Sequence, residues 1–127
     1  MKLKFRWALI WAAFPILGCT PILEEIDRVK SPGGQFDAVV FIRQTDATVA
    51  SPIEIHILPV GGRVNGKPVW RADKVSGMKL SWESAYSLRI SAAEARVVLV
   101  DESATVYSQK MKKTCTISIV YSISQSL

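Results

Sequence analysis

Few residues of this chain could do chemistry: the 127-residue sequence contains one histidine, His56, and two cysteines, Cys19 and Cys115. His56 lies between Ile55 and Ile57, and in a strand that faces its isoleucines inward it points to the opposite face. We therefore predict a solvent-facing or edge-facing histidine rather than a catalytic base. The sequence contains no HExxH, CxxC or GxSxG motif and no array of carboxylates with the spacing of metal ligands. We predict no catalytic residue, no metal site and no cofactor.

Cys19 follows a leader typical of exported proteins. The first six residues carry three basic side chains and no acidic one, and Trp7–Leu17 is apolar throughout. This apolar run has 11 residues and includes Pro15, whereas a helix needs about 20 residues to cross a bilayer. A cleaved signal segment is therefore a better interpretation than a permanent membrane helix.

The junction Ile16-Leu17-Gly18-Cys19 resembles the lipobox of bacterial lipoproteins. The resemblance implies cleavage between Gly18 and Cys19, a diacylglycerol thioether on the Cys19 sulfur, and acylation of the new amino group. Several acyl chains hold a protein to a membrane far more firmly than one chain does. The resemblance also implies a lipid-anchored protein of the bacterial cell envelope. In a cell with two membranes, Thr20 after the cysteine resembles the pattern of outer-membrane lipoproteins that face the periplasm. The alternative is an ordinary secretory leader that happens to precede a cysteine.

Removal of the leader changes the charge of the chain. The 16 basic residues fall to 13, against 11 acidic ones, so the net charge falls from +5 to about +2. Nucleic-acid binding needs a basic face, which this composition does not supply, and we predict no nucleic-acid partner. The one basic cluster is Lys110, Lys112 and Lys113. It indicates a solvated hairpin turn, with contact to a lipid or polyanion as the alternative.

Cys115 is the only other cysteine, so no disulfide can form within the chain once Cys19 carries lipid. Because it lies in an alternating strand pattern, we predict a buried structural thiol. An intermolecular disulfide and a reactive nucleophile remain as alternatives.

The pattern of apolar residues predicts strands joined by short turns. Gln35–Arg43 is apolar on both faces and should be central, whereas Ile53–Pro59 alternates and should keep one face wet. Ser91–Glu94 fits a helix cap, but the β-branched residues that follow favour a strand. Further strands are predicted at Pro68–Ala72, Met78–Trp82, Tyr86–Ile90, Thr105–Ser108 and Cys115–Ile123. We expect an all-β fold, a single antiparallel meander of six to eight strands closing as a sandwich or small open barrel. The domain boundaries follow as 1–18 for the signal peptide, 19–30 for the lipidated N-terminus and tether, and 31–127 for the β-domain.

The Ser31-Pro32-Gly33-Gly34 turn, followed by an apolar strand and the isoleucine-rich strand at Ile55–Pro59, resembles a group of small uncharacterised bacterial envelope proteins. The hairpin with Trp82 and Leu88-Arg89-Ile90 is similar to their later part. These shared motifs are structural, and the resemblance implies no activity.

Two hypotheses for function remain. The first is a membrane-anchored envelope lipoprotein that acts as a non-enzymatic structural or interaction module with an unknown envelope partner. The alternative is a small ligand-binding or inhibitor module, or a small enzyme, with an aromatic-lined pocket at the open end of the sheet. The residues proposed to line that pocket are Trp70, Trp82, Tyr86 and His56. Convergence of these side chains on one concave site would favour the second hypothesis.

Overall fold

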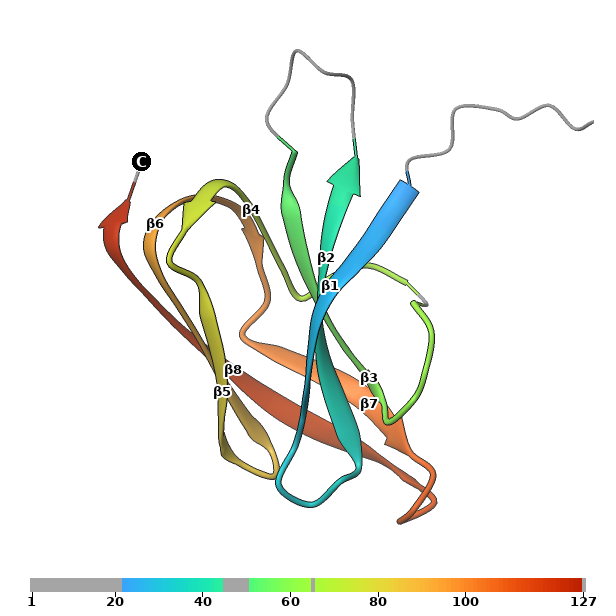
Figure 1. Ribbon diagram of the computed structural model, residues 1–127. Helices are drawn as coiled ribbons and strands as arrows, with labels where there is room; N and C mark the ends of the chain where they lie inside the picture. The colour runs from blue at the N-terminus through green and yellow to red at the C-terminus, as the bar shows by residue number, and fades with distance from the viewer. Residues whose placement is uncertain (1–21, 45–50, 65, 127) are drawn as a thin grey trace, which may run out of the picture.

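Eight strands make up most of the described chain (Figure 1). The computed structural model describes residues 22–44, 51–64 and 66–126. These residues contain no helix, which confirms the predicted all-β class, and no segment among them could cross a bilayer as an apolar helix. The strands are β1 (Ile22–Lys30), β2 (Phe36–Gln44), β3 (Ile53–Pro59), β4 (Trp70–Ser76), β5 (Lys79–Ser84), β6 (Ser87–Val100), β7 (Ser103–Ser108) and β8 (Lys113–Ser126).

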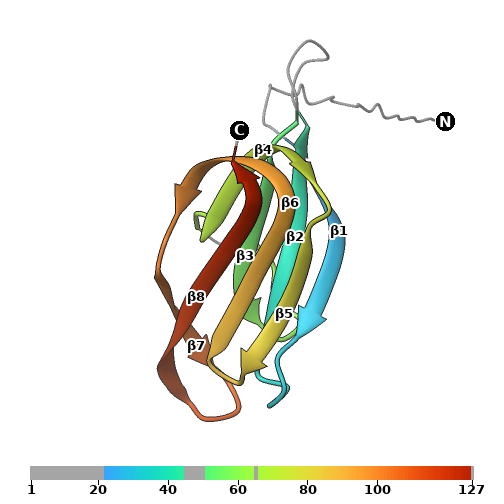
Figure 2. The ribbon, with the colours of Figure 1, turned by 90° about the vertical axis from the view of Figure 1, so that its left-hand side faces the viewer.

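The sheet folds over itself at a bend where β4 ends and β5 begins, and β6 runs alongside both of these strands. β4 and β5 follow each other along β6, with Ser76 opposite Glu94 and Lys79 opposite Ser91. Gly77 lies between them with a φ of 61°, a conformation that glycine adopts without steric cost. Because β4 also pairs with β3, the bend places β5, β6 and β8 in a layer opposite β1, β2 and β3 (Figure 2). The result is a sandwich made from one open sheet, whose end strands β1 and β7 do not pair with each other.

One pairing departs from a simple meander. β8 lies between β6 and β7 in the sheet, antiparallel to β7 but parallel to β6. The turn that joins β7 to β8 covers residues 109–112 and holds two of the three clustered lysines, as predicted. Turn signals identify strands that follow each other in a hairpin, but they do not specify which earlier strand a hairpin then joins.

The core lies between the two layers. Trp70, Phe36 and Leu88 are fully buried there. On β8, Cys115, Ile117 and Ile119 are buried, while the residues between them are exposed, which confirms the predicted register and the buried position of the thiol. β2 is buried from Phe36 through Phe41, as expected for a central strand.

The predicted tether is wrong for residues 22–30, because they form β1. This strand pairs antiparallel with β2 from Ile22 opposite Gln44 to Lys30 opposite Asp37, with a bulge between Glu25 and Asp27. Charged residues occupy most of its positions and most of the strand is exposed, so no apolar alternation marked it. The sheet therefore includes residues 22–30 rather than starting after residue 30, and Gly18 and Cys19 lie outside the described residues.

The connection from β3 to β4 is a loop that begins at Val60 and ends at Val69. Asn65 itself lies outside the described residues. Near its start the loop contacts β1 and β2: the Gly61 N–H donates to a carboxylate oxygen of Asp37 at 3.0 Å, and the Gly62 carbonyl accepts from Arg28 at 3.4 Å. These contacts hold Gly61 and Gly62, which directly precede Arg63 in the loop.

Candidate functional site

The four residues proposed to line an aromatic pocket do not converge. Trp70 is fully buried in the core on the inner face of β4. Trp82 lies on β5, partly buried, and its indole N–H donates to the carbonyl of Val29 on β1 at 2.9 Å. This hydrogen bond joins the edges of the two layers, which is a structural role.

Tyr86 lies in the turn between β5 and β6 and is 37% exposed. Its ring meets Phe36 edge to face with centroids 6.3 Å apart, and its hydroxyl is 3.3 Å from the sulfur of Met111. These contacts place Tyr86 at the end of the molecule where the β1–β2, β5–β6 and β7–β8 turns lie (Figure 1).

The prediction of a solvent-facing or edge-facing His56 is wrong, because its side chain is only 2% exposed. The His56 side chain does point away from the isoleucines of β3, but the face of the sheet on which it lies is covered by other residues. Val39, Phe41 and Leu58 form a second, smaller apolar cluster there, with Leu23 of β1 packed against it. The His56 ring meets Phe41 edge to face at 5.4 Å.

Glu54 is fully buried beside His56, and arginines of the neighbouring strands β2 and β4 contact its carboxylate. One carboxylate oxygen accepts from Arg43 Nε of β2 at 2.5 Å and lies 3.1 Å from Arg71 Nη2 of β4. The other lies 3.2 Å from Nε2 of His56. Both carboxylate oxygens therefore have a donor within reach.

These contacts decide the charges of the pair. Burial alone would raise the pKa of Glu54, but hydrogen bonds from Arg43 and His56 outweigh it and hold the pKa below its ordinary value. Burial lowers the pKa of His56, and the nearby Glu54 carboxylate does not fully offset this. At neutral pH the pair is a carboxylate and a neutral imidazole, and the imidazole Nδ1 has no hydrogen-bond partner among residues 22–44, 51–64 and 66–126. The cluster ties β2, β3 and β4 together.

The sequence carried a signal for this cluster. Val39 and Phe41 make β2 apolar on its second face, and Phe41 is the direct cross-strand neighbour of Glu54. Because β3 pairs with β2, and β2 is covered on both faces, both faces of β3 should be covered as well. That inference would have placed Glu54 and His56 inside.

A groove opens between β3 and β7, because β3 pairs with β4 only through Ile53–Ile55. The groove has a volume of about 310 Å³. Its buried lining is apolar, and its exposed lining includes Arg63 and Tyr107, the latter 50% exposed. The lining residues are Ile57, Leu58, Pro59, Gly62, Arg63, Thr105, Val106 and Tyr107.

This combination suits a small ligand that has an apolar part and one anionic or acceptor group. The apolar part would leave water in the groove, and the Arg63 guanidinium and the Tyr107 hydroxyl can donate to the polar group. Neither residue was proposed from the sequence, since only the fold brings the loop after β3 next to β7.

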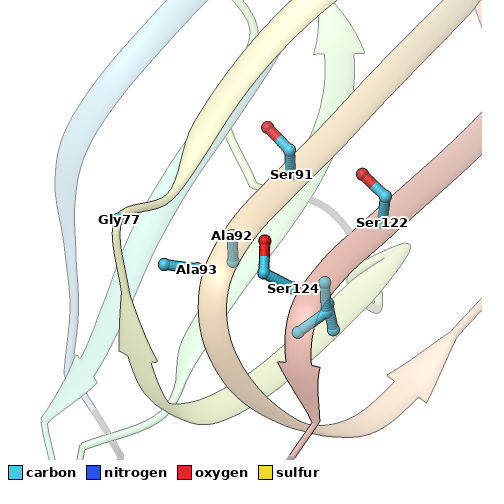
Figure 3. A pocket seen from close by; sticks show the side chains of 7 residues that line it. Gly77, Ser91, Ala92, Ala93, Ser122 and Ser124 are labelled. Atoms are coloured by element: carbon cyan, nitrogen blue, oxygen red, sulfur yellow. The ribbon is translucent and has the colours of Figure 1, made fainter.

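A second hollow, of about 360 Å³, lies over β6 and β8 beside the bend at Gly77. Figure 3 shows the side chains of Ser91, Ser122 and Ser124 around it. Its other lining residues are Gly77, Ala92, Ala93 and Ile123. It offers hydroxyl groups and no charged side chain, so it is less suited than the groove to hold an ion or a strongly polar ligand.

Within the described part of the chain, no group of three His, Cys, Asp or Glu residues lies close enough together to hold a metal ion. Comparison of the chain with protein-family models, with curated proteins and with solved structures gave no match.

Proposed function

We propose that this protein is a lipid-anchored module of the bacterial cell envelope that acts by binding rather than by catalysis. The proposed anchor is Cys19, after signal cleavage at Gly18, and rests on the lipobox-like sequence Ile16–Cys19. In a cell with two membranes the protein would be held in the outer membrane and face the periplasm. Its partner would be another envelope component.

The observation that carries the binding role is the burial of the chain's only histidine. His56 is 2% exposed and its Nε2 contacts Glu54, which is itself fully buried between two arginines. A general base must reach the proton that it removes, and these groups face protein on all sides. Cys115 is also buried, at 6% exposure. The accessible features are a groove, a hydroxyl-lined hollow and strand edges, which are means of binding.

The start of β1 gives the anchor a short reach. Three residue steps separate Cys19 from Ile22, and at about 3.3–3.6 Å per residue they span at most about 11 Å. The anchored domain would therefore rest close to the lipid headgroups, with the end where β1 begins toward the membrane. The turns at the opposite end would point away from it (Figure 1).

Fatty-acid labelling in cells tests the proposed anchor. The wild-type chain should incorporate an alkyne analogue of palmitate and fractionate with membranes. Cys19→Ala should lose the label and leave an uncleaved or released form, whereas Cys115→Ala should keep both label and location. Label that persists on Cys19→Ala would rule out this anchor.

A second candidate function, the binding of a small ligand, is favoured by the groove between β3 and β7. Decanoate is a suitable probe because it combines an alkyl chain with one carboxylate. It should raise the melting temperature of the wild-type domain, less so that of Arg63→Ala, and that of the control Lys79→Ala as much as the wild type. An equal shift in all three proteins would place the probe elsewhere.

A further inference from the structure

The second half of β8 has one unpaired edge. β8 pairs with β7 only as far as Ser118, and beyond that point its one described neighbour is β6. The Ser118 N–H donates toward β6, to Tyr86, while the Ile119 N–H donates the other way, to Glu102. Since the direction alternates along a strand, the backbone groups of Tyr121, Ile123 and Gln125 point away from β6. No strand of the described chain receives them.

This edge lacks the features that normally protect an open strand. From Thr114 to Leu127 the sequence has no charged residue, no proline and no glycine. Edge strands of soluble domains usually carry such residues to prevent pairing with another chain. Here Val120 and Tyr121 are 39% and 44% exposed.

The other open edges differ. β1 carries four charged residues between Glu24 and Arg28, and a bulge interrupts it. β5 is shorter and carries Lys79 and Glu83. β7, the other end strand, is also uncharged, but it has only six residues and faces β3 across the groove. The comparison therefore singles out the free edge of β8 as the one that favours an added strand.

We propose that residues 120–126 of β8 pair antiparallel with the same segment of a second copy, about a two-fold axis through Ile123. With the axis at this residue, each residue of segment 120–126 lies opposite a residue of the same segment in the second copy. Ile123 then exchanges N–H and C=O hydrogen bonds with its twin, and Tyr121 does so with Gln125 of the partner subunit. A second copy fits because an uncharged segment meets its own sequence without repulsion. The pairing involves the sheet alone and does not depend on lipid at Cys19.

The two-fold axis allows a test by charge substitution. A charged residue at position 123 would lie directly opposite the same residue of the second copy, and like charges in that position disfavour pairing. In sedimentation equilibrium, the full chain with Cys19→Ala in mild detergent should have twice the monomer mass of 14.0 kDa. Adding Ile123→Lys or Ile123→Glu should give monomers, and a mixture of the two should restore a dimer. Val98→Lys, at a 62% exposed position on β6, should stay dimeric.

A monomeric parent chain would overturn the proposal, as would Lys and Glu variants that both remain dimers. Folded variants that stay monomeric when mixed would also contradict it, since opposite charges should attract at the axis. Circular dichroism checks that each variant is folded.

A cysteine cross-link decides the matter if the charged variants do not fold. Residues in a hydrogen-bonded antiparallel pair have Cα atoms about 5.5 Å apart, a separation that a disulfide can bridge. With Cys19 and Cys115 both replaced by alanine, Ile123→Cys should form a covalent dimer under mild oxidation at least ten-fold more readily than Thr116→Cys. Thr116 is exposed on the half of β8 that β7 already covers, so equal cross-linking would mean random collision and would contradict the proposed pairing.

Discussion

Glu54 keeps its charge in a fully buried position because each of its carboxylate oxygens has a donor. Arg43 and Arg71 donate hydrogen bonds to one carboxylate oxygen, and Nε2 of His56 lies within hydrogen-bond distance of the other. Breaking such a cluster by removing one partner leaves a buried charge without compensation, which costs more than the intact cluster contributes. These residues therefore act as one unit that holds three adjacent strands in register.

His56 should make the stability of the domain depend on pH. Burial holds its pKa below the ordinary value of 6.5, so the unfolded chain takes up a proton at higher pH than the folded chain does. Stability is then fully present above the ordinary value and falls as the pH decreases toward the folded-state pKa. The lowered pKa of Glu54 adds a similar loss only below its ordinary value of 4.5.

Urea unfolding of residues 20–127 at about pH 7.5 and about pH 5.5 measures this effect. The wild-type domain should be less stable at the lower pH, and His56→Gln should show little of that decrease. Because His56 is the only histidine of the chain, an equal decrease in the variant would mean that another group titrates in this range.

Among the elements, β8 has the clearest division between its faces. Ile119 is 6% exposed, whereas Ser118 beside it is exposed. Ile119→Ala should lower the free energy of unfolding by about 2–5 kcal/mol, because it removes buried methyl groups and leaves a cavity. Ser118→Ala should change it by less than about 0.5 kcal/mol. Similar effects in denaturant melts would mean that β8 is in another register.

A strand was predictable from the sequence where the spacing of its own apolar residues shows which of its faces are buried. β2 is apolar on both faces, β8 alternates, and the β5–β6 hairpin shows its register as Leu80 opposite Ile90 and Trp82 opposite Leu88. β1 was missed because an exposed edge strand gains its stability from backbone pairing, which leaves no apolar pattern. The parallel pairing of β6 with β8 was missed because it depends on how the layers pack.

The candidate site was less predictable than the fold for a related reason. The groove joins the loop after β3 to β7, and its exposed residues Arg63 and Tyr107 are 44 positions apart in the sequence. Neither lies in a local motif. The buried position of Glu54 and His56 depends in turn on the second face of β2, so it follows from pairing rather than from their own strand.

At the scale of the whole molecule, the proposed anchor and the fold together give the domain an orientation. The sheet begins at Ile22, three steps after Cys19, so the membrane would lie next to the start of β1. The turn with Lys110 and Lys112 lies at the far end (Figure 1). That position favours a solvated turn over a contact with the anchoring membrane.

Mass spectrometry of the N-terminal peptide of the protein, purified from cell membranes, tests the lipid anchor most directly. We expect a peptide that begins at Cys19 and carries the mass of a diacylglycerol thioether, with a further acyl chain on its amino group where the cell performs that step. A peptide that begins at another residue, or at Cys19 with an unmodified thiol, would contradict the account.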